Sequence, residues 1–203
     1  MNNEKDAPNY RVRSIHNTDF KTREENGEMF IEGYFAVFNS IYELWSGATE
    51  EIAPGAFSDT LGDDIRALIN HDSTLVLGRN RAGTLELRED SVGLWGRIRV
   101  NPNDTDAVNC YERVKRGDVS QCSIGFDILS ENTDVNGNDV HWTILAVKLY
   151  EVSVCTFPAY EETSIAARQC DFSTVKKRRF DEWKTRTLQK LKGEANGTEN
   201  IDA

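Results

Sequence analysis

The sequence has few of the residues that build disulfide frameworks or zinc sites. It contains four cysteines and three histidines among 203 residues, and no two cysteines have the C-x-x-C spacing. A structural zinc site usually needs such closely spaced pairs, so the spacing argues against one. Three of the cysteines lie within apolar patterns, and we therefore expect reduced thiols that pack as small core residues. The four are Cys110, Cys122, Cys155 and Cys170.

Long hydrophobic runs are also missing. Apolar stretches such as "ILAV" are too short to span a bilayer, which needs about 20 apolar residues. The opening stretch "MNNEKDAPNY" is polar and lacks the charged and apolar regions of a signal peptide. The sequence therefore predicts a protein that works in a cytoplasm without a membrane partner.

Negative charge dominates most of the chain, but it is unevenly spread. The formal net charge is -10, yet residues 171–203 carry eight Lys and Arg against six Asp and Glu. The remaining 170 residues carry 16 basic and 28 acidic side chains. Such an acidic body repels nucleic-acid phosphates, so we expect no nucleic-acid partner.

What the chain does contain is a series of strand signals separated by tight turns. The "NG" at residues 26–27 predicts a hairpin, because both central residues of that turn need positive φ. One helix is predicted to begin at Asp104 or Thr105 and to stop at Gly117. Two long strands surround "DVNGND" further on. These patterns predict an α+β domain, dominated by antiparallel sheet, that ends near Arg168.

The end of the chain differs in character. The stretch "DFSTVKKRRFDEWKTRTLQKLKG" places apolar side chains at helical spacing among lysines and arginines. We predict two parts: residues 1–170 form the folded domain, and residues 171–203 form a basic amphipathic helix followed by a disordered tail, "EANGTENIDA". The helix is either an exposed appendage or packs on the domain through Phe180, Trp183 and Leu191.

Ser123 lies in a predicted strand whose two faces differ sharply. In "VSQCSIGFDIL" apolar side chains alternate with polar or small ones, which predicts one core face and one open face. The core face holds Cys122, Ile124, Phe126 and Ile128, and the open face holds Gln121, Ser123, Gly125 and Asp127. Ser123 is therefore a better nucleophile candidate than Cys122, although a serine on a polar strand face is commonly just solvated.

A serine nucleophile needs a base, and the chain offers three histidines. His71, in "LINHDST", lies where a strand meets a loop, among small polar residues. His16 lies in a polar stretch, and His141 lies early in a strand beside Trp142. His71 is thus the favoured base, with an ordinary loop histidine as the plain alternative.

Glu151 is the candidate for the third group, which would hold the other nitrogen of the imidazole. It is embedded among apolar strand residues in "KLYEVSVCTF", where a carboxylate costs free energy unless hydrogen bonds or a cation compensate. A hairpin turn at residues 136–137 places Glu151 and Ser123 on opposite faces by simple alternation. A bulge, a shifted register or a different pairing is therefore required. Asp72 and Asp127 are the other acids to consider.

Six segments, taken in order, resemble the caudoviral prohead serine proteases, which mature viral capsids. They are "GYFAVFN", "EEIAPGAF", "LINHDSTLVLGR", "GTLELREDSVGLWGRIRV", "VKRGDVSQCSIGF" and "LYEVSVCTFPAY". The resemblance covers about residues 30–167. Its most specific parts are the N-H-D, S-x-G-F and L-x-E-V-S…P-A-Y segments. This family commonly has methionine or another apolar residue before the serine, so Cys122 is a mild departure.

Residue by residue, the resemblance implies that His71 is the base, Ser123 the nucleophile and Glu151 the third member of a catalytic triad. It implies a serine endopeptidase that cleaves scaffold and major capsid protein segments, and itself, inside an assembling prohead in the host cytoplasm. The implied fold is similar to that of herpesvirus assemblin, a mainly antiparallel β-barrel surrounded by helices, here with a C-terminal helical tail. No metal or organic cofactor is implied, and a homo-oligomer is left open.

Two other functions compete with this interpretation. A non-catalytic capsid-assembly or scaffold-binding protein would keep the fold without the chemistry, but the presence of His71 and Ser123 in their expected motifs favours the enzyme. A cysteine hydrolase would use Cys122 or Cys155, which the strand pattern disfavours.

Overall fold

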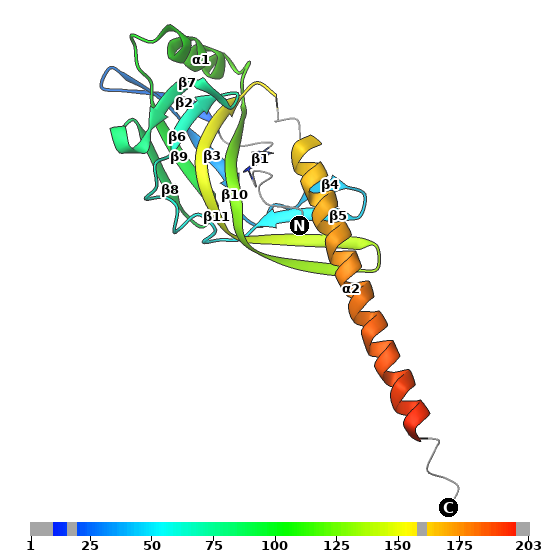
Figure 1. Ribbon diagram of the computed structural model, residues 1–203. Coiled ribbons are helices and arrows are strands. Elements are labelled where there is room, and N and C mark those ends of the chain that lie inside the picture. The colour runs from blue at the N-terminus through cyan, green and yellow to red at the C-terminus, as the bar shows by residue number, and fades with distance from the viewer. Residues whose placement is uncertain (1–9, 16–19, 158–161, 198–203) are drawn as a thin grey trace, which may run out of the picture. The chain divides into compact units, whose positions relative to one another are not determined.

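The computed structural model describes residues 10–15, 20–157 and 162–197. The chain divides into two compact units, Met1–Glu161 and Glu162–Ala203. The first unit carries the described strands, one α-helix and a short 3-10 helix, and the described part of the second is a single long helix (Figure 1).

The larger of two sheets in the first unit is built around the two longest strands, β10 (Gln121–Asn136) and β11 (Asp139–Cys155), which pair antiparallel. Its other strands are β1 (Tyr10–Ile15), β4 (Tyr42–Trp45), β5 (Ala48–Ile52), β6 (Arg66–Ile69) and β7 (Asp72–Arg79). β1 pairs with the outer side of β10, while β5 and β6 both run parallel to β11. The sheet therefore brings β6 and its following turn beside the end of β11.

The smaller sheet is antiparallel throughout, in the order β2-β3-β9-β8. Its strands are β2 (Lys21–Glu25), β3 (Glu28–Val37), β8 (Leu85–Glu89) and β9 (Gly93–Arg99), and a short 3-10 helix, η1 (Asn80–Ala82), precedes β8. The predicted turn at residues 26–27 joins β2 to β3, with φ of 54° and 81° at its two residues. Only residues that tolerate the left-handed region, such as asparagine and glycine, fit this turn easily.

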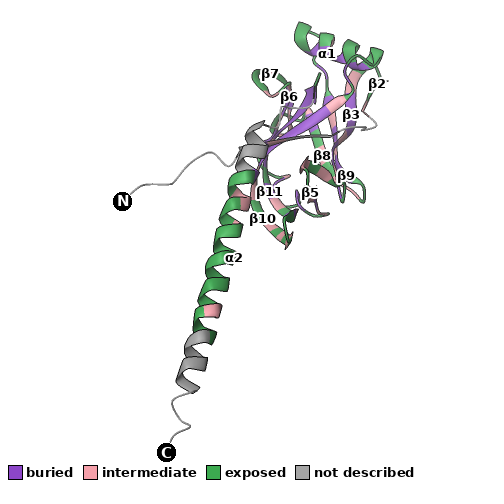
Figure 2. Cartoon of the chain, turned by 90° about the vertical axis from the view of Figure 1, so that its right-hand side faces the viewer, coloured by how far each residue is buried: buried purple, intermediate pink, exposed green. Residues whose placement is uncertain are grey.

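One core joins the two sheets. It contains Ile31 and Phe35 of β3 together with Ile124 of β10 and Val152 of β11, all 0% exposed. In Figure 2 the strand β3 is largely coloured as buried, whereas β10 and β11 are buried over only part of their length. Burial of such side chains is the main favourable term in folding, at about 1.5–3 kcal/mol for each large one.

The helix α1 (Thr105–Arg116) adds its apolar stripe to the same core through Ala107, Cys110, Tyr111 and Val114. The Asp104 side chain accepts hydrogen bonds from the N–H groups of Asp106 and Ala107, which caps the first turn. Gly117 ends the helix in the left-handed conformation. The predicted helix is therefore confirmed at both ends.

The α+β class is confirmed, since the described chain is mostly strand with two α-helices. The described strands pair as two sheets that do not close into a barrel. The assemblin-like barrel therefore stays a prediction.

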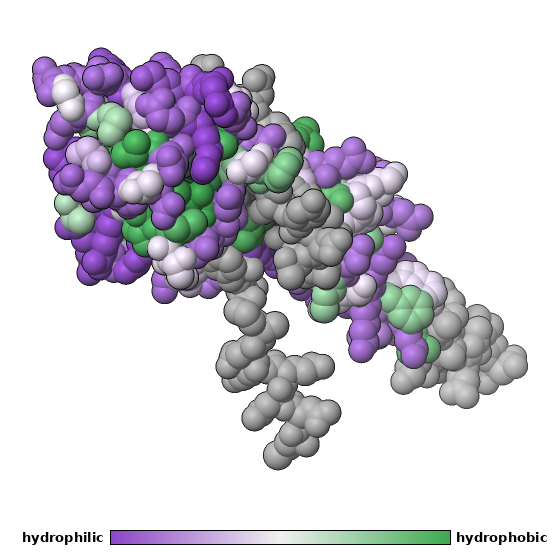
Figure 3. Space-filling model, turned by 90° about the horizontal axis from the view of Figure 1, so that it is seen from above, coloured by the Kyte–Doolittle hydropathy of each residue, from purple (hydrophilic) through white to green (hydrophobic). Residues whose placement is uncertain are grey.

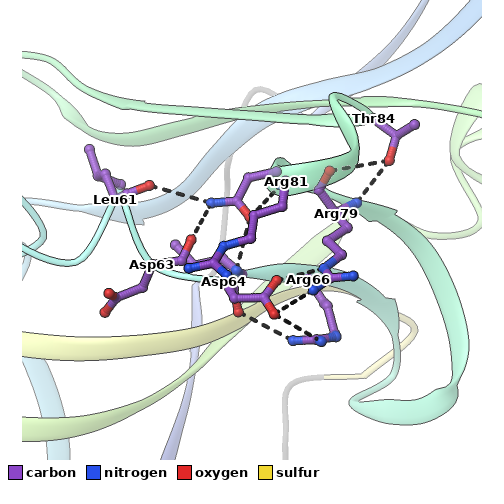
Figure 4. A network of polar contacts seen from close by, with 9 residues as sticks. Leu61, Asp63, Asp64, Arg66, Arg79, Arg81 and Thr84 are labelled. Atoms are coloured by element: carbon purple, nitrogen blue, oxygen red, sulfur yellow. Dashed lines mark hydrogen bonds and ion pairs between the residues drawn. The ribbon is translucent and has the colours of Figure 1, made fainter.

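The open end of the β6–β7 hairpin is held by a polar network (Figure 4). Asp64 accepts hydrogen bonds from Nε and Nη2 of Arg79, both at 2.6 Å, and a further one from Arg66 at 3.2 Å. The hydrogen bond from Arg79 lowers the pKa of Asp64 to about 2, against the opposing effect of burial. The Asn80 side chain ties the same region together by accepting from Ile65 N–H and donating to the Asp63 carbonyl. The network fixes the end of the hairpin opposite its turn.

The second unit is the helix α2 (Glu162–Gly197). It begins before the predicted residue 171 and includes residues 194–197, for which disorder was predicted. The helix extends beyond the predicted bounds because alanine and glutamate, both strong helix formers, occur near each of its ends. Phe180 and Trp183 are 59% and 60% exposed, and their ring centroids lie 5.8 Å apart. The side chain of Leu191 lies outside the described residues.

The surface of α2 is mainly hydrophilic, with single hydrophobic residues along it (Figure 3). Among the residues described, no helix combines the length and the apolar character needed to cross a membrane.

Candidate active site

His71 occupies a strained position in a tight turn. β6 ends at Ile69 and β7 begins at Asp72, so Asn70 and His71 form a two-residue hairpin turn, with φ of 50° and 61°. Both central residues of such a turn adopt left-handed conformations, which asparagine tolerates but which are costly for most side chains. Non-glycine residues held in this region cluster at functional sites. The backbone thus marks His71 as a candidate independently of its chemistry.

Three hydrogen bonds attach this turn to the end of β11. Asn70 N–H donates to the Val154 carbonyl at 3.0 Å, and Asn70 Oδ1 accepts from Thr156 N–H at 2.9 Å. His71 N–H donates to Ser153 Oγ at 3.2 Å. The backbone of the histidine is therefore positioned by β11.

Glu151 holds the imidazole ring of His71. Glu151 Oε1 lies 2.6 Å from His71 Nδ1, and the two side chains are 7% and 17% exposed. A carboxylate only accepts hydrogen bonds, so the proton of this contact belongs to Nδ1. Nε2 of the neutral ring is then left with a lone pair, as a general base requires.

A bulge in β11 turns Glu151 toward the face of Ser123. The β10–β11 turn lies at residues 137–138, one position later than predicted, and the register shifts between Gly125 and Phe126. The shift makes Tyr150 an extra residue in β11. Beyond it, Glu151 lies opposite Gly125, so its side chain shares a face with that of Ser123. The irregularity that the sequence requires is therefore present.

Strand pairing connects Ser123 to the His71–Glu151 pair through Ser153. Ser123 is opposite Ser153 of β11, whose hydroxyl contacts both His71 N–H and the Glu151 carboxylate. The alternation prediction holds for the core face, where Cys122 and Ile124 are 0% exposed.

The expectation that Ser123 lies on an open face is wrong, because it is also 0% exposed. β1 pairs along the outer side of β10, with Ser14 opposite Ser123, so the serine belongs to a central strand. A small side chain between neighbours on both sides is easily enclosed. The sequence pattern gave no sign of this pairing, because β1 is more than a hundred residues away in the chain.

The other acids and histidines considered have different partners. Asp72 accepts from N–H and Oγ1 of Thr74, at 2.8 and 2.6 Å, and Asp127 accepts from the Tyr150 hydroxyl at 2.7 Å. His141 contacts Glu51 and Thr49, in a separate histidine–acid pair. His16 and the P-A-Y part of the last motif lie outside the described residues.

Cys155, which the sequence offered only as an alternative nucleophile, is a neighbour of the site. Its Sγ lies 3.8 Å from His71 Nε2. Burial, followed by electrostatic repulsion from Cys122 and Glu151, raises the pKa of this thiol to about 12. A thiol in that state stays neutral near pH 7, whereas the thiolate is the reactive species. Cys155 is therefore a poor nucleophile despite its position.

We expect Cys155→Ala to retain most of the proteolytic activity, because the neutral thiol takes no part in the chemistry. The substitution should lower the free energy of unfolding by about 1 kcal/mol, because it removes a small buried group. Cleavage rates and thermal unfolding of the purified variant measure both effects. An inactive but folded Cys155→Ala protein would instead support a cysteine hydrolase.

Ser153 was missed from the sequence. The available signal was a serine two residues after Glu151 in an otherwise apolar run, "YEVSVC". Such a residue shares the face of Glu151 and must satisfy its hydroxyl in a buried place.

Within the ranges that the structure describes, no group of three or more His, Cys, Asp and Glu side chains gathers in a way that could hold a metal ion. That the chain uses no cofactor stays a prediction. The candidate site offers instead a base, an acid and hydroxyl groups, the set used for acyl transfer to serine.

Comparison with known proteins gives independent findings. A family model described as caudovirus prohead serine protease matches residues 16–178. The chain is 28% identical over 189 residues to the prohead protease of Enterobacteria phage HK97, covering 91% of this chain and 80% of that protein. The solved structure of the bacteriophage T4 capsid assembly protease has a TM-score of 0.48 at 12% identity, covering 72% of this chain and 97% of that chain. The family match includes His71, Ser123 and Glu151.

Proposed function

Because the chain belongs to the caudovirus prohead serine protease family, we propose that Ser123, His71 and Glu151 are its catalytic triad. The chain is a serine endopeptidase of capsid maturation. The observation that carries the assignment of residues is the 2.6 Å contact between His71 Nδ1 and Glu151 Oε1 on the strand face shared with Ser123.

In the proposed reaction, His71 Nε2 accepts the proton of Ser123 Oγ as that oxygen attacks the scissile carbonyl. The peptide C–N bond then breaks, and His71 gives the proton to the leaving amine, which leaves an acyl-enzyme. Water, deprotonated by His71, hydrolyses the ester and restores the serine. Glu151 holds the ring in the required tautomer and stabilises the imidazolium that forms in each half.

The proposed substrates are segments of the major capsid protein and of the scaffold, and the chain itself. We place the reaction inside the assembling prohead, in the host cytoplasm, without a nucleic-acid or membrane partner. The assemblin-like barrel and a homo-oligomer belong to the same proposal. The acidic body of the chain supports the exclusion of nucleic acid.

Co-expression with the major capsid protein of the same virus tests this function. Intact-mass spectrometry should find a shortened capsid protein, with one new terminus that the Ser123→Ala chain does not generate. A capsid protein that is bound but stays full length would favour the non-catalytic assembly protein.

We expect deletion of residues 171–203 to leave folding and peptide cleavage in solution unchanged but to prevent incorporation into proheads. Phe180 and Trp183 are more than half exposed, so their removal loses little buried apolar area. A basic amphipathic helix can bind an acidic or apolar scaffold surface. Circular dichroism and a peptide assay test the first part, and immunoblots of purified proheads test the second.

A shorter truncation that removes only residues 198–203 leaves α2 whole and serves as the control, which should enter proheads normally. An insoluble or unfolded 171–203 deletion would show that the helix is structural. A folded deletion variant that still enters proheads would show that the helix does not direct the protein into them.

A further inference from the structure

We propose that Ser153 is a positioning residue that ties the base and the acid of the site together. The inference rests on the proposed triad and assigns a role to a side chain outside it. Ser153 is 0% exposed and lies directly opposite Ser123 in the β10–β11 ladder.

The Ser153 hydroxyl acts both as a hydrogen-bond donor and as a hydrogen-bond acceptor. Ser153 Oγ donates to Glu151 Oε2 at 2.6 Å, and it accepts from His71 N–H at 3.2 Å. Glu151 uses its other oxygen, Oε1, to accept from His71 Nδ1 at 2.6 Å. The contacts therefore close a ring that runs from the His71 backbone through Ser153 and Glu151 to the His71 imidazole.

The direction of each proton follows from the groups themselves. A carboxylate has no proton to give, so the single hydroxyl proton of Ser153 points to Glu151. The lone pairs of the same oxygen then face the His71 N–H. Ser153 is thereby occupied as a donor and is unsuited to act as the nucleophile, although its Oγ accepts a hydrogen bond from His71 N–H.

This closed set of hydrogen bonds restricts two motions of the site, one of the Glu151 carboxylate and one of the His71 turn. Without Ser153, Glu151 Oε2 loses a 2.6 Å hydrogen bond that helps to fix the plane of the carboxylate against the imidazole. The strained conformation of His71, with φ of 61°, also loses one of the hydrogen bonds that attach the turn to β11. Both changes misalign the base at the moment of proton transfer, and misplacement of about 1 Å can cost about 100-fold in rate.

The test is Ser153→Ala in the full chain, measured on a peptide that spans a cleavage site of the capsid protein. We expect kcat to fall by about 10- to 100-fold with KM nearly unchanged, since the hydroxyl contacts the catalytic groups rather than the substrate. In a Glu151→Gln background the same substitution should cost less than about threefold, because residues that act through one another are not additive.

Thr60→Val is the matched control. Thr60 is also buried, and its hydroxyl also accepts a backbone N–H, from Leu149 at 2.9 Å, and donates to a carboxylate, that of Asp63, at 3.1 Å. We expect the control to lower thermal stability and to leave kcat unchanged. Loss of kcat in Ser153→Ala at a stability equal to that of the control would therefore come from positioning.

Wild-type kcat in Ser153→Ala would overturn the inference, as would an equal loss with and without the Glu151 carboxylate. Either result leaves the proposed function intact so long as Ser123→Ala is inactive. Activity of Ser123→Ala would instead remove the proposed triad, so the two failures are distinguishable.

Discussion

Replacing Ser123 by alanine is expected to abolish cleavage of the capsid protein, with a fall in kcat of about 10⁶-fold. The substitution removes the only atom that forms the acyl-enzyme in the proposed reaction. Because Ser123 is small and fully buried, loss of its oxygen should leave the fold unchanged. Mass spectrometry of co-expressed capsid protein detects cleavage even at low rates.

Cys122→Ala is the control for this result. Cys122 is adjacent in sequence and also 0% exposed, but it lies on the core face, where its Sγ is 3.0 Å from the Tyr34 carbonyl oxygen. We expect it to lose about 1 kcal/mol or more of stability and to keep its activity when folded. If the Ser123→Ala protein still processes the capsid protein fully, the serine mechanism is wrong.

Replacing His71 by alanine is expected to be almost as damaging as replacing Ser123, because triad members act as a unit. Glu151→Gln should retain more activity, since the amide still occupies the site. It weakens the hydrogen bond that orients the His71 ring and the stabilisation of the imidazolium, but it removes neither catalytic group. Single-turnover cleavage of a capsid peptide measures both effects.

His141→Ala provides a matched control, because His141 also contacts a carboxylate, with Nε2 3.4 Å from Glu51 Oε1. This variant should keep its rate. An active His71→Ala protein, or loss of activity in His141→Ala instead, would reject His71 as the base.

The elements that were predicted well depend on neighbours in sequence. The α1 helix has its cap at Asp104 and its stop at Gly117, and the β2–β3 turn has Asn26 and Gly27 at the two left-handed positions. Each of these signals acts over a few residues. Their geometry follows from local sequence whatever the rest of the chain does.

The contacts that assemble the site are non-local. His71 and Glu151 are 80 residues apart, and the parallel pairing of β6 with β11 brings them together. The face that Glu151 occupies depends on one extra residue, Tyr150, which alternation alone does not locate. The place of Ser123 in a central strand depends on β1, from near the start of the chain. The candidate residues could therefore be identified from the sequence, but their arrangement in space follows from the strand pairing, which the sequence pattern does not show.

Active-site labelling tests the central claim most directly. A preparation that cleaves capsid protein is treated with a fluorophosphonate, which reacts with activated serine hydroxyls, and the adduct is located by peptide-mapping mass spectrometry. We predict one adduct, on Ser123, that is lost in the His71→Ala protein. An adduct on Ser153, or full proteolytic activity in a preparation whose Ser123 stays unlabelled, would contradict the account.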